Sequence, residues 1–160
     1  MSGLDAYKHG NYSEAQHDYE QALLDSRKSG DKINEAASLN NLGMIASDHG
    51  DYKQAKAYFE KALALLIASN NEDRQARALN NLGTTYVLLK DAQAKEYSEQ
   101  ALELAKKLKN PTLEVQSLNN LGLISKNNGQ YVKELAYFDQ SLEVSQGCST
   151  LQDHVKLTVF

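Results

Sequence analysis

Apolar residues recur along this chain at the three- and four-residue spacing of one helical face. The clearest stretch has small or apolar residues at positions i, i+3, i+4 and i+7, namely Leu39, Leu42, Gly43 and Ala46. This spacing predicts an amphipathic helix over about 32–49. The next stretch predicts a second helix over about 52–69, and Gly50 between the two supplies a left-handed residue that ends the first helix.

The same pair of helical stretches is repeated along the chain. The phrase Leu-Asn-Asn-Leu-Gly begins at Leu39, again 40 residues later at Leu79, and again 39 residues later at Leu118. Self-similarity at this period is typical of a solenoid. The sequence therefore predicts an all-α fold of about four antiparallel helical hairpins. The repeat array is expected over residues 1–146, with units at about 2–29, 31–69, 72–108 and 111–146.

Polar residues predict where several of these helices begin. Asp31, Asn71 and Asn110 each precede a first helix and are expected to be its N-cap. Pro111 then falls in the first helical turn, where a proline costs least. Residues 147–160 are expected to form either a tail or a short terminal helix, since residues 150–153 resemble a capping box.

The third and fourth units depart from the repeat. The third lacks one residue in its inter-helix turn, where Lys90 replaces a glycine and the tyrosine that follows the other turns is missing. Ser98 replaces the aromatic residue that the second unit has at Phe59, and Glu134 replaces an alanine. We expect a tighter or differently shaped turn in the third unit, and less regular packing of the third and fourth hairpins.

Charge and composition narrow the range of functions. The net charge is −4 with both signs mixed along every segment, so nucleic acid is not an expected partner. The longest apolar run, Ala62 to Ala68, is too short to cross a bilayer, and no secretory signal is recognisable at the start, so no membrane partner is expected. The single cysteine, Cys148, cannot form an internal disulfide, and a cytoplasmic location is expected.

The positions that recur within each unit resemble a known family. A Leu-Gly pair ends the five-residue phrase, a turn follows, and Ala55, Phe59 and Ala62 then stand at spacings of four and three. The pattern is similar to that of the tetratricopeptide repeat family, in a form of about 40 residues, over about residues 3–145. The resemblance implies hairpins stacked in a right-handed superhelix. It also implies a concave groove, lined by the first helix of each unit, that holds a peptide or a protein segment.

Each residue advances about 100° around a helix, so the face opposite the apolar stripe can be identified. It is expected to line the groove, and its asparagines, matched between units, would form a ladder that pairs with the main chain of a peptide. The candidate groove residues are Asn41, Met44, Asp48, Arg77, Asn81, Thr84, Leu88, Gln116, Asn120, Leu123 and Asn127.

A structural role for the same amides is the alternative. Asparagines on adjacent helices can instead bond to one another at the seam between units. We favour this seam role for Asn40, Asn80 and Asn119, which lie on the flank, and the ligand role for Asn41, Asn81 and Asn120.

No enzymatic, metal or cofactor site is expected. The four histidines are scattered, and no phosphate-binding loop, nucleophile elbow or metal-ligand spacing is present. The favoured function is a non-enzymatic scaffold that binds a segment of another protein. The alternatives are self-association through solenoid ends that lack polar caps, and a docking or sensing fragment of a larger regulator.

Overall fold

The protein is an array of helical hairpins, seen in a computed structural model that describes the backbone of residues 2–157 and the side chains of residues 2–147. Eight helices and no strands occur within residues 2–157. The helices are α1 (Gly3–Lys8), α2 (Tyr12–Ser29), α3 (Lys32–Asp48), α4 (Tyr52–Ala68), α5 (Glu72–Leu88), α6 (Ala94–Lys107), α7 (Pro111–Asn127) and α8 (Tyr131–Leu157).

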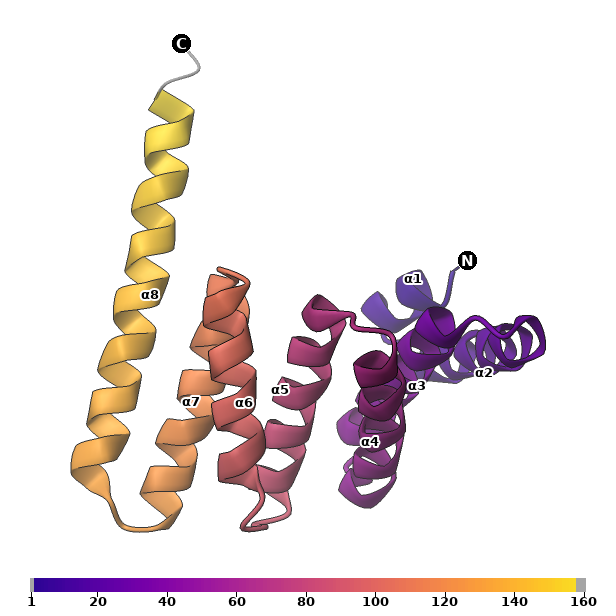
Figure 1. Ribbon diagram of the computed structural model, residues 1–160, viewed down its shortest axis with the longest axis horizontal. Helices are drawn as coiled ribbons and strands as arrows, with labels where there is room; N and C mark the ends of the chain where they lie inside the picture. Colours follow the sequence, from indigo (N-terminus) through magenta and orange to yellow (C-terminus); the bar gives the residue numbers. More distant parts are fainter. Residues whose placement is uncertain (1, 158–160) are drawn as a thin grey trace.

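The hairpins stack side by side in chain order as a right-handed superhelical solenoid (Figure 1). Each helix packs against its neighbours in sequence, and α5 also contacts both α3 and α7. We call α1, α3, α5 and α7 the first helices of their units and α2, α4, α6 and α8 the second helices. Because α5 touches the first helices on either side of it, their surfaces are continuous from α3 to α7.

The predicted caps begin three of the first helices. The side chain of Asp31 accepts a hydrogen bond from the backbone N–H of Asn34, and Asn71 and Asn110 accept from the third residue of their helices in the same way. Pro111 is the first residue of α7. These side chains satisfy backbone donors that have no partner inside the helix. The second unit's helices end within one residue of the predicted positions.

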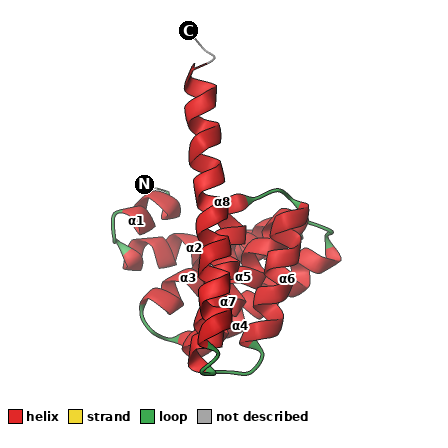
Figure 2. Ribbon diagram, turned by 90° about the vertical axis from the view of Figure 1, so that its left-hand side faces the viewer, coloured by secondary structure: helices red, strands yellow, loops and turns green. Residues whose placement is uncertain are grey.

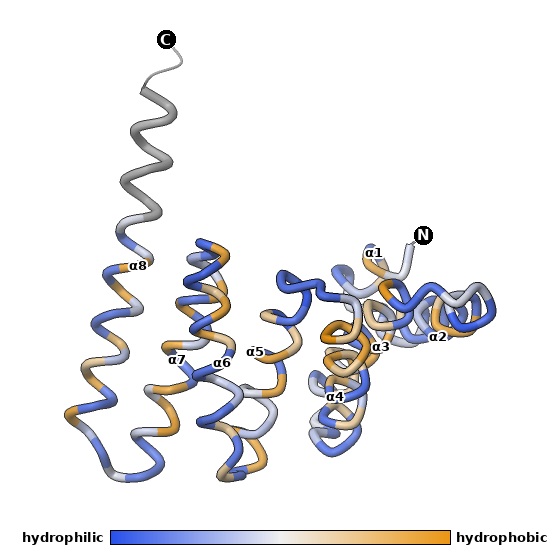
Figure 3. Tube along the Cα trace, in the orientation of Figure 1, coloured by the Kyte–Doolittle hydropathy of each residue, from blue (hydrophilic) through white to orange (hydrophobic). Residues whose placement is uncertain are grey.

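The core lies between the two helices of each hairpin and between successive hairpins. Figure 3 shows hydrophobic and hydrophilic residues alternating along each helix, as the sequence pattern predicts. Gly43 lies against the ring of Phe59, and Gly122 lies against Phe138 in the corresponding place of the fourth unit. The glycine of the five-residue phrase is therefore a packing residue that lets the second helix approach the first.

The third unit reaches a similar packing by different means. Lys90 adopts a left-handed backbone with φ 55°, and the turn behind it is tighter than the others, as expected. Ser98, which replaces an aromatic residue, is fully buried and bonds to the carbonyl oxygen of Ala94. The ring of Tyr86 on α5 stacks on that of Tyr97 on α6, with centroids 5.0 Å apart. A stacked aromatic pair therefore fills part of this hairpin.

The last helix differs from the expectation for the C-terminal residues. Residues 147–157 continue α8 without a break, so no separate helix begins at Thr150. A single glycine, Gly147, lowers helix propensity without breaking a helix, and no proline or second glycine follows it. Figure 2 shows α8 extending past the rest of the array. Within the described chain α8 packs against α7 and no other helix.

Candidate protein-binding surface

The paired asparagines of the repeated phrase connect the first helices of successive units. The amide of Asn81 on α5 donates to the side-chain oxygen of Asn40 on α3 over 3.0 Å. One unit further, the amide of Asn120 on α7 donates to the hydroxyl of Thr84 on α5 over 3.0 Å. These bonds form a polar seam that runs from α3 through α5 to α7.

The other asparagine of α5 belongs to the same seam. The amide of Asn80 donates to Gln116 over 3.1 Å, and its oxygen lies 3.4 Å from the amide nitrogen of Asn120 and 3.5 Å from the hydroxyl of Ser117. Asn80 and Asn120 are each only 6% exposed. A buried amide that lacked these bonds would be costly, so the seam fixes the register of one unit on the next.

The asparagines thus divide differently from the prediction. Asn40 and Asn80 lie at the seam, as favoured from the sequence. Asn120 also lies there, because burial and its bonds to α5 leave no surface for a ligand. Asn81 donates to the seam but remains half-buried, and Asn41 is half-buried on the surface of α3. The sequence could not separate these cases, since the difference depends on the angle at which one unit packs on the next.

A hollow with a volume of about 570 Å³ opens on the first helices, between α1, α3 and α5. Its apolar lining includes Leu4 of α1 together with Ala37 and Met44 of α3. Asn41 also lines it, as does Arg77 of α5. Three of the predicted groove residues, Asn41, Met44 and Arg77, therefore meet in one hollow. The remaining lining residues are Ala36, Asn40, Leu66, Asp73 and Arg74.

A second, smaller hollow of about 170 Å³ adjoins the first at Met44. Asp48, Asn81 and Thr84, all predicted groove residues, line it together with Tyr7 of α1. The hydroxyl of Tyr7 donates to the carboxylate of Asp48 over 2.6 Å. This hydrogen bond connects the short helix α1 to the end of α3. Burial and the same bond raise the pKa of Tyr7.

The other four candidates lie further along the array. Leu88 and Leu123 are exposed side chains, and Gln116 is exposed while accepting the Asn80 bond. Asn127 lines a separate hollow at the turn between α5 and α6. The predicted residues thus form one cluster around Met44 and a looser series along α5 and α7.

The charges around the larger hollow partly compensate each other. Arg77 pairs with Asp73 at 3.2 Å on the same helix, and both side chains are more than half exposed. Arg74 also lines the hollow. The pKa of Asp31 is lowered mainly by the hydrogen bond that its carboxylate accepts from the backbone N–H of Asn34, and to a smaller extent by the positive charge of Arg74. The guanidinium group of Arg77 is exposed to water, which weakens its electrostatic interactions.

Sequence reasoning missed Leu4, Tyr7 and Arg74 as contributors to this surface. Leu4 and Tyr7 belong to α1, whose six residues gave too short a stretch to assign a face. Arg74 lies in the first turn of α5, one turn before Arg77. The three-residue spacing of the two arginines was the available signal for Arg74.

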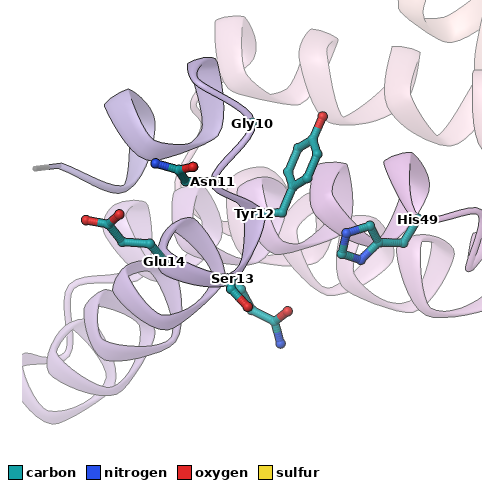
Figure 4. Close-up of a pocket in the computed structure, with 7 residues that line it drawn as sticks. Gly10, Asn11, Tyr12, Ser13, Glu14 and His49 are labelled. Atoms are coloured by element: carbon teal, nitrogen blue, oxygen red, sulfur yellow. The ribbon is translucent and has the colours of Figure 1, made fainter.

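Another hollow lies at the turn between α1 and α2, where Asn11, Tyr12 and Glu14 line it together with His49 of the next unit (Figure 4). Its volume is about 630 Å³. The ring of Tyr12 meets that of His49 edge-on, with centroids 5.4 Å apart, and meets Tyr7 in the same manner at 5.6 Å. Tyr12 therefore connects the first unit to the second at this edge of the array.

The described part of the chain holds neither a cluster of metal-ligand side chains nor a membrane-spanning helix. Among the side chains of residues 2–147, no three His, Cys, Asp or Glu residues lie close enough together to hold a metal ion. Within residues 2–157 no helix combines the length and the apolar character needed to cross a bilayer.

Solved structures resemble this chain in fold. BtubC (BKLC) from P. vanneervenii superposes with a TM-score of 0.82 at 27% identity, over 92% of this chain and 61% of that one. A putative kinesin light chain of Podosopora anserina with nearly identical TPR-like repeats superposes with a TM-score of 0.68 at 18% identity, over 91% of this chain and 72% of that one. A point variant of the Podosopora protein gives a TM-score of 0.72 at 17% identity, over 92% and 73%. This chain thus spans less than two thirds of BtubC.

Sequence comparison gives the family directly. No curated protein matches the chain. The family model described as tetratricopeptide repeat matches residues 2–68 and again residues 69–147, which together cover most of the chain. The chain therefore belongs to the tetratricopeptide repeat family, whose members generally act by binding other proteins and are typically non-enzymatic scaffolds.

Proposed function

We propose that this protein is a scaffold that binds an extended segment of another protein on the surface of α1, α3 and α5. The observation that carries the proposal is the pair of adjoining hollows that share Met44. Together their linings offer apolar contacts, side-chain amides and guanidinium groups around Met44. A segment with an apolar side chain and a nearby carboxylate is the partner that this surface fits best.

The apolar part of the surface supplies most of the affinity in this proposal. A net hydrogen bond contributes only about 0.5–1.5 kcal/mol, whereas a micromolar ligand needs about 8 kcal/mol. Asn41 and Asn81 alone cannot supply this. Burial of a partner side chain against Leu4, Ala37 and Met44 adds about 25 cal/mol for each Å² of apolar surface removed from water.

The flexible thioether of Met44 suits this role. Met side chains adapt to partners of different shape, and Met44 is half-buried at the point where the two hollows meet. Its sulfur also accepts a weak bond from Asn40 at 3.7 Å. A bound segment would therefore contact the seam asparagine indirectly, through Met44.

The test uses peptides selected by display against the intact chain, followed by fluorescence polarisation with the tightest binders. We expect Met44→Glu to weaken them at least tenfold, because it places a charge where the two hollows meet. Ala57→Glu, at an exposed position on α4, is the matched control and should leave the affinity unchanged. Selected peptides that bind Met44→Glu as tightly as the unmodified protein would overturn the proposal.

Self-association through α8 is a second candidate function, favoured by one observation. Leu142 on α8 is 56% exposed, whereas its counterparts Leu23 and Leu63 on α2 and α4 are each 8% exposed. Tyr131, Val132 and Leu135 are also exposed on α8. A second copy that covered these side chains would remove apolar surface from water.

Light scattering over a range of protein concentrations tests this candidate. We expect the mean mass to rise with concentration, and the double variant Leu135→Glu, Leu142→Glu to remain at the mass of one chain. Both side chains are exposed, so the variant should keep its helical circular dichroism. A constant monomer mass for the unmodified protein would rule self-association out.

The longer length of BtubC supports a third alternative, in which these repeats dock or sense for a larger regulator. A cytoplasmic setting would suit each candidate, since the single cysteine of the chain cannot form an internal disulfide.

A further inference from the structure

The turn between α5 and α6 is shorter than the corresponding turns of the other units. In the second unit the N–H of Ala55 donates to Asp51 four residues earlier, whereas in the third unit the N–H of Ala94 donates to Asp91 three residues earlier. The helix α6 begins only at Ala94 and has 14 residues against 17 in α4. The residue that this turn lacks is the tyrosine present as Tyr52 in the second unit.

A hollow of about 520 Å³ lies beside this shortened turn, between α5, α6 and α7. Val87 and Ile124 supply part of its lining, and both are half-buried side chains that pack against the core. Polar residues line the rest, with Lys90 and Asn128 among them. The remaining lining residues are Asp91, Ala92, Ala94, Lys95 and Asn127.

The corresponding place between the first and second units carries its own aromatic ring. There Tyr12 lies edge-on to His49, the counterpart of Asn128. Two separate hollows flank this contact, one of about 630 Å³ at the turn and one of about 180 Å³ that reaches Ile45, the counterpart of Ile124. Between the third and fourth units one hollow is lined both by residues of the turn and by Ile124. The two places also differ in the tyrosine, which the third unit lacks.

We propose that the hollow at the α5–α6 turn is a binding site for a tyrosine side chain presented by a partner protein. The ring would lie on Val87 and Ile124, near the place that the chain's own tyrosine takes in the first unit. The phenolic hydroxyl would meet the amides of Asn127 and Asn128, which can both donate and accept hydrogen bonds.

The lysines of the hollow are compatible with an aromatic occupant. Lys90 and Lys95 both line it, and Lys95 also lies 3.5 Å from Glu99. An ammonium group above a ring face is attractive, and the chain already uses this contact where Lys56 lies 4.7 Å from the ring centroid of Tyr86. This hollow is separate from the one at Met44, so the proposal does not depend on the function proposed above.

The test is a titration of the methyl-labelled protein with N-acetyl-L-tyrosinamide, observed by NMR. We expect saturable shifts of the Ile124 and Val87 methyl signals and none at Ile45, and N-acetyl-L-alaninamide should shift none of them. Insertion of a tyrosine between Asp91 and Ala92 restores the length of the other turns and should abolish the shifts. Ala92→Tyr, which keeps the chain length, should abolish or strongly reduce them if the insertion unfolds the protein.

Three results would each overturn the proposal. They are an Ile124 signal that stays unmoved at saturating probe, equal shifts with both probes, and binding of the probe by Ala92→Tyr as tight as binding by the unmodified protein. Met44→Glu alters only the hollow on the first helices and should leave this titration unchanged, which separates the two sites.

Discussion

Gly43 of α3 lies in direct contact with the ring of Phe59 on α4: a methyl group added at Gly43 would lie 2.6 Å from the ring carbon Cε1. That distance is shorter than any stable non-bonded carbon–carbon contact, so the ring or the backbone would have to move. We expect Gly43→Ala to lower the free energy of unfolding by about 1–3 kcal/mol. Urea unfolding followed by circular dichroism measures the change.

Gly147 provides the matched control for this prediction. It also lies inside a helix, but an added methyl group there meets nothing within 4 Å. Alanine is the better helix former by about 1 kcal/mol. Gly147→Ala should therefore leave stability unchanged or raise it, and equal losses in both variants would contradict the packing role of Gly43.

The buried amide of Asn120 should contribute to stability, whereas that of Asn41 should not. Asn120→Ala removes bonds to Thr84 and Asn80 and leaves their polar atoms with fewer partners. We expect a loss of about 1–3 kcal/mol. Asn41→Ala, at the half-buried counterpart in the second unit, should change stability by less than about 0.5 kcal/mol. Thermal melts of the two variants side by side decide whether the seam is structural.

Glu35 should make stability depend on acid pH. The hydrogen bond from Lys32 lowers the pKa of this nearly buried carboxyl, and a second hydrogen bond from Arg27 lowers it further. Burial acts in the opposite direction, but the two bonds outweigh it. A lowered folded pKa contributes stability above the unfolded value of about 4.3, and this stability is lost as the pH falls through the folded pKa. Glu35→Gln should be less stable than the unmodified protein at pH 7 by about 1 kcal/mol.

The comparison is made by urea unfolding of both proteins at several pH values. The difference between them should shrink steadily below about pH 4. A difference that is the same at low and neutral pH would mean that Glu35 contributes by packing and not through its charge.

Tyr86 should titrate at unusually high pH. Burial and the bond from its hydroxyl to Glu60, at 2.8 Å, raise its pKa. A raised tyrosine pKa contributes stability below the unfolded value of about 10, and this stability is lost as the pH rises further. The near-ultraviolet absorbance of tyrosinate should show a late step that loses the contribution of one tyrosine in Tyr86→Phe, while Tyr7, whose pKa is also raised, still titrates late. In the urea-unfolded protein all tyrosines are exposed to water, so the late titration step should merge with that of the other tyrosines.

The repeat made much of the fold predictable. The apolar spacing, the phrase that begins at Leu39, and the capping residues Asp31, Asn71 and Asn110 are all local features, and most of the helices and their pairing in hairpins follow from them. Stacking follows too, because a single amphipathic hairpin cannot bury its apolar face alone. The course of α8 beyond Gly147 was not predictable in this way, since the local capping signal at Thr150 competes with the continuing helix.

The surface was only partly predictable. Periodicity alone identified Met44, Asn41 and Arg77, which do meet at one hollow. It assigned Asn120 to the same surface, although this side chain is buried at the seam. One helical position spans about 100°, so a modest rotation of one unit on the next moves a flank residue from solvent to an interface.

The sequence by itself therefore determined the helices, their pairing in hairpins and the family, because these depend on contacts between residues close in the chain. Only the tertiary structure decided which asparagines bond between units and which hollows open. It also decided that Tyr86 stacks on Tyr97 in the unit where Ser98 replaces an aromatic ring. These features depend on the distance and angle between packed helices, and such geometry is set by all the side chains at an interface together.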